Sequence, residues 1–522
     1  MPIRIYLLLF ILGIIPPVII SRFQPAPGYL DSDYYYAGGI QLATGKGFNE
    51  PYLWNYLDNT TSLPHPSHSY WMPLASIIAA AGMLLTGQIT YSSGRLLFFI
   101  IAALVPPITA ALAFTFSQKR EFAVTSALFS IFSVYHASFV GVTDNFGIYM
   151  LLGGLYFLIA TKILAGPNRN RSWFFLGLLA GLLSLSRTDG LLWLVLTFLF
   201  AFWQLEWNQK FRKVRSFAIN SFLAFLGFLV IMAPWYVRNI NIYGSVMAPG
   251  GSRVLWLDNY DQTFIYPPTQ LSVDYFLSLG WKEILADRLG ALKINLQSGF
   301  AAHGGIILFP FIVAGYIANK NDTRVRLAGM AWLILFLVMT FVFPFAGARG
   351  AFFHAGAALQ PIWWSLAPLG LEAVLASLRN RGWGNDQTRL IFHSALIMIT
   401  IILTVFVVHL RLITLGWGEG EDNYPMVERF LVEKGIEEND IVIVRNAPGY
   451  YLETGRSAIS IPYGGEQAIL DVSKQFGAEY LVVESEAVLQ PILSLYQSPH
   501  GHAHFDYLGE VDEIRIYKIN FE

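Results

Sequence analysis

Residues 30–48 read LDSDYYYAGGIQLATGKGF and come shortly after an apolar run, Ile3 to Ile20, that is long enough to cross a bilayer. Asp31 and Asp33 stand just beyond the end of this run. Charges are costly inside hydrocarbon, so two acids beside a predicted span place this stretch at the membrane surface. We expect a helix that starts near Tyr34, outside the membrane.

The composition defines the class of protein. The chain has 522 residues, of which 55% are hydrophobic and 13% charged, and its mean hydropathy is +0.49. A soluble chain carries about 25% charged residues, so the sequence predicts a polytopic α-helical membrane protein. The net charge of −1 gives no sign of nucleic-acid binding, and a chain without cysteine has no disulfide, thiolate nucleophile or Cys-bound zinc.

The first span resembles a signal peptide in having Arg4 before its apolar run. No small-x-small cleavage site follows in SRFQPAPG, so we expect a retained helix. Ten further stretches match a span, which makes about eleven transmembrane helices. They cover residues 93–116, 121–141, 145–164, 172–186, 189–206, 215–235, 303–318, 325–345, 357–376 and 390–412.

Residues 70–87, YWMPLASIIAAAGMLLTG, are apolar but short. We expect them to be re-entrant or to lie in the plane of the outer leaflet, and the alternative is a twelfth span. The choice affects sidedness, because one more crossing would move every later connection to the other side of the membrane.

Basic residues divide the connections between spans into two sets. Lys and Arg gather in residues 117–120, 166–172, 208–215, 319–326 and 377–389. The positive-inside rule places these connections in the cytoplasm together with the N-terminus. The first outer loop (22–92), the second outer loop (236–302) and the C-terminal tail are then extracytoplasmic, in what we expect to be a bacterial plasma membrane.

The C-terminal stretch leaves the membrane pattern at about residue 423. Short apolar runs at 440–447, 458–462 and 478–484 predict buried strands, and amphipathic helices are predicted at 424–436 and 466–477. We therefore expect a transmembrane domain over residues 1–415 and a small extracytoplasmic α/β domain over residues 420–522. It has no glycine-rich phosphate loop, so a nucleotide-binding role is unsupported.

Polar residues gather at the outer ends of the predicted spans, where topology does not require them. They are Asp31 and Asp33, His65 and His68 in PHPSHSYW, Asp144 in GVTDNFG, Arg187 and Asp189 in LSRTDGLL, Arg238 in APWYVRN, and Arg349 and His354 in GARGAFFH. Six segments thus bring acids, arginines and histidines to one depth. Such a set suits a reaction between a lipid-borne anion and a hydroxyl or amine acceptor.

The acids and arginines also have structural interpretations. Asp31 or Asp33 can cap the helix that follows them. Arg187 can form an ion pair with Asp189 at a helix end, and Arg238 can anchor the chain to lipid headgroups. These alternatives remain open on the sequence alone.

The histidines also have structural interpretations. His65 and His68 have the spacing of zinc ligands but no third ligand nearby, so we predict no metal site there. Arg349 and His354 form an exposed turn pair by default. The Asp-x-Asp pair can hold a divalent cation as well as act as a base, so metal dependence is undecided.

The order of these motifs resembles the GT-C membrane glycosyltransferases. LDSDYYYAGGIQLATGKGF is followed by WMPL, TDN, SRTDG and APWYVRN, an order most similar to the branch containing protein O-mannosyltransferases and the lipid A aminoarabinose transferase. The likeness covers roughly residues 1–350. It implies a membrane transferase that moves a sugar from a polyprenyl-phosphate donor to an acceptor on the extracytoplasmic face, usually with inversion.

The resemblance also implies roles for the acids. The motif in the first outer loop includes the family's catalytic base, which falls on Asp31 or Asp33, although Ser32 separates two acids that are usually adjacent. We expect Asp31 to be the base, because it lies nearer the exit of the first span. Asp144 would orient the acceptor or assist the base.

The remaining predicted contacts follow from this mechanism. We expect Arg187, Arg238 and Arg349 to bind the donor phosphate, because a guanidinium matches phosphate bidentately and stays charged. The predicted sugar or acceptor contacts are Tyr35, His65, His68, Trp71 and His354.

Two other classes of protein fit the composition. A transporter or flippase for a lipid-linked or anionic substrate should show inverted repeats or polar groups near the bilayer midplane. A non-catalytic scaffold leaves the outer polar residues unexplained. The sugar stays open, as does the acceptor, which can be a glycan, a lipid or a protein in the cell envelope.

Overall fold

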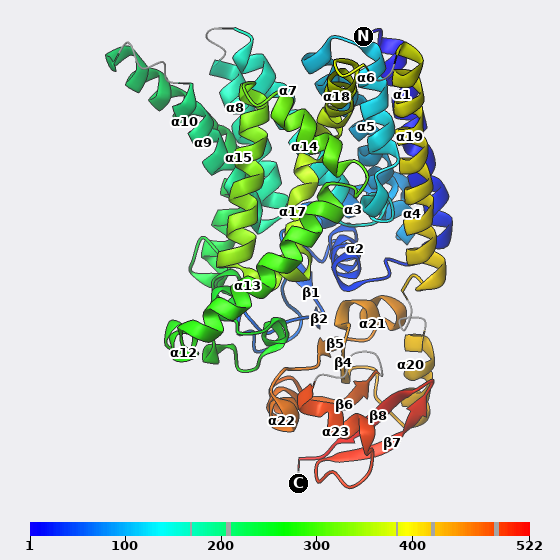
Figure 1. The fold of residues 1–522 in the computed structure, drawn as a ribbon. Helices are drawn as coiled ribbons and strands as arrows, with labels where there is room; N and C mark the ends of the chain where they lie inside the picture. The colour runs from blue at the N-terminus through cyan, green and yellow to red at the C-terminus, as the bar shows by residue number, and fades with distance from the viewer. Residues whose placement is uncertain (167–169, 205–209, 383–384, 419–422, 485–489, 522) are drawn as a thin grey trace.

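The computed structural model describes residues 1–166, 170–204, 210–382, 385–418, 423–484 and 490–521. Figure 1 shows a helical bundle with a small α/β domain at one end. The long helices of the bundle are α1 (Ile3–Ile20), α5 (Leu96–Ser117), α7 (Phe146–Leu164), α10 (Lys210–Tyr243), α13 (Trp281–Ser298), α15 (Thr323–Leu337), α18 (Gln360–Arg379) and α19 (Asp386–His409).

Seven helical segments of the described chain are long and apolar enough to cross a membrane. They are Ile3–Phe23, Tyr91–Ser117, Phe146–Leu164, Val214–Tyr243, Thr323–Val342, Pro344–Arg379 and Gln387–Thr414. Each coincides with a predicted span, and the protein is an integral membrane protein, as its composition predicts.

The other four predicted spans fall on helices that are shorter than the roughly 20 residues a span needs. These helices are α6 (Arg120–Ile131), α8 (Asn170–Ser186), α9 (Leu191–Trp203) and α14 (Phe309–Ala318). The stretch 70–87 contains α3 (Leu74–Thr86), which is also too short to cross.

The span predicted over residues 121–141 is wrong in its second half, because α6 ends at Ile131. The chain then runs irregularly but stays buried. Side chains from other segments satisfy its backbone: Gln24 donates to the carbonyl of Ser138 (2.8 Å), and the amide of Val134 donates to Thr404 (3.2 Å). Irregular backbone is tolerated at membrane depth when protein supplies its hydrogen bonds.

The basic connections lie together at the end of the bundle that holds the N-terminus. Arg324 donates to Thr115 at the end of α5 (2.8 Å), and Arg389 at the start of α19 pairs with Glu121 at the start of α6. The α/β domain lies at the opposite end, as Figure 1 shows. Residues 167–169, 208–209 and 383–384 of the predicted basic connections lie outside the described residues.

The α/β domain contains a six-stranded sheet in the order β2-β5-β4-β6-β8-β7. The predicted strands are β4 (Ile441–Val444), β5 (Ala458–Ser460) and β6 (Ala478–Val483), and the predicted helices are α20 (Tyr424–Glu433) and α22 (Gly465–Phe476). The sequence did not predict α21 (Ala447–Thr454) or the antiparallel pair β7 (Phe505–Val511) and β8 (Ile514–Ile519).

One edge of this sheet comes from the first outer loop. Strand β2 (Tyr52–Leu53) pairs in parallel with β5. The α/β unit therefore includes residues outside 420–522, and the division of the chain near residues 415–420 stays a prediction that falls partly outside the described residues. The sheet ties the first outer loop to the C-terminal tail.

Helix α2 (Leu30–Ala43) carries the two acids of the opening motif and packs closely on α3. Gly39 makes this approach feasible, because a Cβ built there would lie 2.8 Å from the Cβ of Ala79 and 3.3 Å from the amide nitrogen of Ala80. The glycine pair in YYYAGG thus has a packing role.

We expect Gly39→Ala to lower the melting temperature in detergent, because overpacking a close contact typically costs about 1–3 kcal/mol. Gly290→Ala in α13 is the matched control, since nothing lies within 4 Å of its added methyl group and alanine favours a helix. Equal melting temperatures for the two variants would show that α2 and α3 can move apart freely.

Candidate active site

Helix α2 begins at Leu30, four residues before the start predicted at Tyr34. Asp31 and Asp33 therefore lie inside its first turn, where the helix dipole favours negative charge. Neither acid is the N-cap, and the N-cap residue makes no side-chain cap hydrogen bond.

Ser32, which separates the two acids, fastens α2 to the turn before α7. Its hydroxyl lies 2.9 Å from the hydroxyl of Thr143, which also donates to the Ser32 carbonyl (3.0 Å). Both residues are fully buried. This contact brings the start of α2 to the neighbouring residue, Asp144.

Asp31 and Asp144 form a pair of like charges. Burial raises the pKa of both carboxyls, and the charge of Asp144 raises the pKa of Asp31 further. Tyr29 donates to Asp144 (2.5 Å), as does the amide of Asn145 (2.5 Å), and Arg187 favours the ionised form of both acids. The Asp31 carboxylate has no hydrogen bond to another side chain in the described part of the chain.

Arg187 is held beside these acids by Asp189. Its Nε and Nη2 donate to one carboxylate oxygen at 2.9 and 2.7 Å, and Tyr149 donates to the other at 2.8 Å. The ion pair proposed from the sequence is thus formed. It fixes the arginine at the end of α8 while the charge of Arg187 still reaches Asp31.

Asn145 forms a second fixed layer behind Asp144. Its amide donates to Tyr35 of α2 (2.7 Å) and accepts from Ser186 at the end of α8 (2.5 Å). Three segments far apart in sequence are therefore joined at this depth by buried hydrogen bonds.

Asp33 faces away from this site. Residues two apart on a helix point in nearly opposite directions, and Asp33 accepts a hydrogen bond from Asn446 of the α/β domain (2.8 Å). Asp31 and Asp33 do not converge, so the Asp-x-Asp pair does not form a cation site. Among the described residues no group of three or more His, Asp or Glu side chains is placed to hold a metal ion.

His65 is buried between two carboxylates. It stands directly opposite Glu50 in the pairing of β1 (Asn49–Glu50) with β3 (His65–Pro66). Its Nδ1 lies 3.2 Å from Glu50 and its Nε2 3.3 Å from Asp58. Burial lowers the pKa of His65, but the charges of Glu50 and Asp58 more than offset it and leave the pKa raised.

His68 uses both ring nitrogens within the protein. Nδ1 lies 2.7 Å from the hydroxyl of Ser67, and Nε2 lies 3.0 Å from that of Ser76 on α3. Its backbone amide is also occupied, because it donates to the hydroxyl of Tyr34 (2.6 Å). The sugar or acceptor contacts predicted for His65 and His68 stay predictions, and both rings have structural partners.

Aromatic rings surround the start of α2. Trp71 stacks on Trp54, with ring centroids 4.0 Å apart and planes 10° apart, and its ring also lies against Tyr34 and Tyr35. Trp71 and Tyr35 thus lie beside the acids, where the sequence predicted contacts to sugar or acceptor.

The other predicted arginines differ in how they are used. Arg238 donates to the carbonyls of Ser67 (2.7 Å) and Phe48 (3.3 Å), so it supports the first outer loop. Arg349 is exposed and stands 5.3 Å from the ring of Tyr260, and it has no hydrogen bond or ion pair within the described chain.

His354 lies close to the acids. Its Nδ1 is 3.8 Å from Asp144, and its ring stacks on Phe146 at 4.0 Å. Of the predicted site residues, Asp31, Asp144, Arg187, Tyr35, Trp71 and His354 come together, whereas Asp33, His65, His68 and Arg238 contact other parts of the protein. Arg349 lies at the edge, next to Tyr260.

Sequence reasoning missed three participants: Tyr29, Ser186 and Tyr260. Tyr29 directly precedes the acidic motif and Ser186 directly precedes Arg187, so adjacency to a motif was the available signal. Tyr260 belongs to a loop without any recognisable motif, and only the fold brings it to the site.

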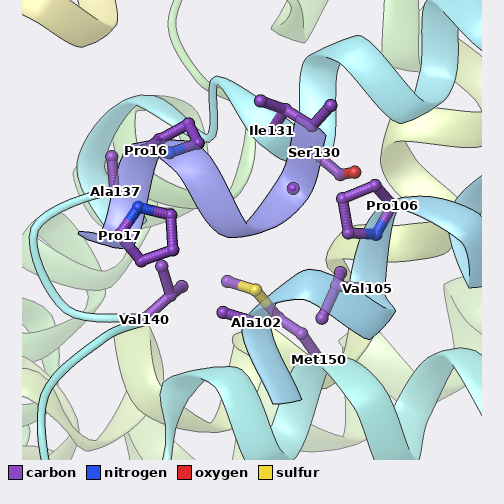
Figure 2. Close-up of a pocket in the computed structure, with 11 residues that line it drawn as sticks. Pro16, Pro17, Ala102, Val105, Pro106, Ser130, Ile131, Ala137, Val140 and Met150 are labelled. Carbon is purple, nitrogen blue, oxygen red and sulfur yellow. The ribbon is translucent and has the colours of Figure 1, made fainter. Parts of the chain in front are cut away.

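A separate cavity among the membrane helices is apolar. Figure 2 shows Pro16 and Pro17 of α1 facing Val105 and Pro106 of α5 around it. Its volume is about 20 Å³, room for about one water molecule. No charged side chain lines it among the described residues.

The fold, a helical bundle with acids at one end and an α/β domain over that end, is also found in solved structures of other proteins. Among solved structures the chain is similar to the oligosaccharyltransferase AglB from Archaeoglobus fulgidus in complex with an inhibitory peptide and a dolichol-phosphate, with a TM-score of 0.54 and 13% identity over 92% of this chain and 69% of that one.

It is also similar to ArnT from Cupriavidus metallidurans bound to undecaprenyl phosphate, with a TM-score of 0.53 and 13% identity over 98% of this chain and 97% of that one. The sequence matches no protein-family model and no curated protein. The fold class expected from the motif order is confirmed.

We expect His65→Ala to destabilise the protein strongly, since removing one member of a buried charge cluster typically costs about 3–5 kcal/mol. His409→Ala, at an exposed position, is the control. Combining His65→Leu with Glu50→Gln and Asp58→Asn should recover part of the lost melting temperature, because no unpaired charge remains. If His65→Ala melts like the control, the cluster does not stabilise the loop.

Proposed function

We propose that this protein is an integral membrane glycosyltransferase that moves a sugar from a polyprenyl-phosphate donor to an acceptor, with inversion at C1. The observation that carries the proposal is the meeting of Asp31, Asp144 and Arg187 at the end of the bundle that faces the α/β domain. The similar AglB and ArnT structures, which contain a dolichol-phosphate and undecaprenyl phosphate, support a lipid-phosphate donor.

Asp31 is the general base in this proposal. Its carboxylate takes the proton of the acceptor hydroxyl while the acceptor oxygen attacks C1 of the donor sugar. The bond from C1 to the acceptor forms as the bond from C1 to the phosphate oxygen breaks, and the electron pair leaves with the polyprenyl phosphate. The transition state is oxocarbenium-like, as in other glycosyl transfers.

Asp144 assists the base. Its charge raises the pKa of Asp31, which brings a carboxyl closer to the pH at which it can exchange protons efficiently. Tyr29 and the amide of Asn145 hold the Asp144 carboxylate in place. His354, 3.8 Å away, is placed to contact the acceptor.

Arg349 and Arg187 are the proposed cations for the departing phosphate. Arg349 is exposed, and its guanidinium has no hydrogen bond or ion pair in the described chain. Its N–H donors are therefore available to phosphate oxygens. Arg187 contributes charge from a fixed position. Arg238 supports the first outer loop in this scheme, because loop carbonyls occupy its donors.

The experiment that tests the function is incubation of the purified protein with a radiolabelled polyprenyl-phosphate sugar and extracted envelope acceptors. A transferase converts the label into a water-soluble or acceptor-bound form and releases polyprenyl phosphate. A transporter or scaffold leaves the donor intact, and that result would refute the proposal.

We propose that the N-terminus is cytoplasmic and the α/β domain extracytoplasmic, in a bacterial plasma membrane. Support comes from the basic connections, which share the N-terminal end of the bundle. Reporter fusions at residues 45 and 480 should both report the extracytoplasmic side. Opposite reports from the two positions would contradict this orientation.

Asp31→Asn and Asp33→Asn should differ sharply in activity. A positioned base contributes a factor of about 100 to 10,000 in rate, so transfer should fall by that much in Asp31→Asn with the melting temperature unchanged. Asp33→Asn should keep partial activity, because its partner Asn446 can still bond to an amide. Near-normal turnover in both variants would exclude the motif from catalysis.

Transfer should also decline on acidification, because the base acts only when deprotonated. The acid limb of kcat/KM should lie well above the ordinary Asp pKa of about 3.9, since burial and Asp144 raise the pKa of Asp31. Asp144→Asn should move the limb to lower pH by removing one of these causes. A limb that stays in place in Asp144→Asn would identify a different titrating group.

A further inference from the structure

A cavity of about 390 Å³ opens between the second outer loop and the α/β domain. One wall carries Asp258, Gln262 and Tyr275, and the other carries Tyr463, Gln467 and Asp471. Its volume lies within the range of about 300–1,000 Å³ that is typical of small-ligand sites. The candidate site around Asp31, Asp144 and Arg187 and the proposed mechanism do not use any of these residues.

Hydrogen bonds hold the walls in place. The amide of Tyr463 donates to the carbonyl of Phe264 (2.9 Å), which joins the α/β domain to the second outer loop. Gln262 is buried, accepts from the amide of Asp258 (2.8 Å) and donates to Tyr275 (2.8 Å). The cavity is therefore preformed, which reduces the entropy lost when a ligand binds.

The lining selects against anions. Two carboxylates, three glutamines and three tyrosines line the cavity, and none of the described residues around it is basic. A phosphate or an acidic lipid headgroup would meet Asp258 and Asp471 without a compensating cation. The polyprenyl-phosphate donor therefore does not belong here.

The same lining suits a ligand rich in hydroxyl groups. Carboxylates accept from hydroxyls, glutamine amides both donate and accept, and phenols do both while offering a flat apolar face. Gln467 already donates to Asp471 (2.9 Å), which leaves the other carboxylate oxygen open to a ligand. Neutral saccharides present these complementary groups.

A short helix connects the cavity to the candidate base. Helix η5 (Tyr260–Phe264) contributes Gln262 to the cavity wall and Tyr260 to the site. Burial raises the pKa of Tyr260, and the charges of Tyr70 and Asp31 raise it further. Arg349 stands over the same ring, 5.3 Å from its centroid.

We propose that this cavity binds the non-reacting sugar units of a glycan acceptor, an uncharged oligosaccharide whose terminal hydroxyl reaches Asp31. The proposal rests on the glycosyltransferase function and narrows its acceptor to a neutral glycan. A peptide acceptor is an alternative outcome of the test.

Binding is measured by saturation-transfer NMR on the full chain in detergent. The probes are neutral oligosaccharides of two to four hexose or N-acetylhexosamine units, with an uncharged hexapeptide as the competing class. At least one saccharide should bind, and its Kd should rise at least tenfold in Asp471→Ala and in Gln467→Ala. Lys474→Ala, on the same helix but outside the cavity, should bind like the native protein.

Three results would overturn the proposal. They are the absence of binding by any saccharide, saccharide binding with a Kd that neither cavity substitution changes, and binding of the peptide instead of the saccharides. Size-exclusion profiles and melting temperatures of the three variants exclude loss of fold as the cause.

Donor turnover separates this proposal from the function itself. In the cavity variants the KM for the glycan should rise about tenfold while the KM for the donor stays constant. Donor consumption with unchanged acceptor KM would refute the cavity and leave the function standing. Saccharide binding that depends on Asp471, in a protein that never consumes donor, would refute the function and leave the cavity standing.

Discussion

The first turn of α2 is held from two sides, and the site depends on this constraint. The Ser32 hydroxyl is bonded to Thr143 of the bundle, and the Asp33 carboxylate is bonded to Asn446 of the α/β domain. Between these two contacts the helix cannot rotate, which holds Asp31 at the end of the bundle where the charge of Asp144 raises its pKa. Successive residues on a helix point in different directions, so Asp31, Ser32 and Asp33 can each contact a different part of the protein.

The polar residues at this end of the bundle differ in whether other side chains pair with them. Arg187 is paired with Asp189, and Asn145 is bonded on both sides by Tyr35 and Ser186. Asp31 stands next to another acid. Like charges in a partly buried environment cost folding energy, and carboxyls with perturbed pKa values cluster at functional sites.

The α/β domain is part of the site's architecture. Strand β2 from the first outer loop completes the edge of its sheet. Helix α21 contacts α2 through its N-cap residue Asn446 and through Tyr451, which accepts from Gln41 (2.8 Å). The buried cluster of Glu50, His65 and Asp58 closes the base of the same loop. Movement of the domain would therefore displace the helix that carries Asp31.

The sequence by itself determined the membrane class, seven spans, three strands and two helices of the C-terminal domain, and most of the segments that meet at the candidate site. These features depend on local composition and on a bilayer thickness that sets the length of an apolar helix. The span predicted over residues 121–141 is wrong in its second half, where protein and not lipid surrounds the chain. An apolar run in the sequence does not reveal which of the two will cover it.

The tertiary structure decided which acid faces the site, which histidine is enclosed by carboxylates, and that β2 joins a distant sheet. Ser32 and Thr143 are 111 residues apart, and Asp33 and Asn446 are 413 apart. Such pairs leave no periodic signal, because each forms only when the bundle and the α/β domain close around α2. Tyr260 comes to lie against Arg349 in the same way, because its loop carries no sequence motif and its position is set by the packing around it.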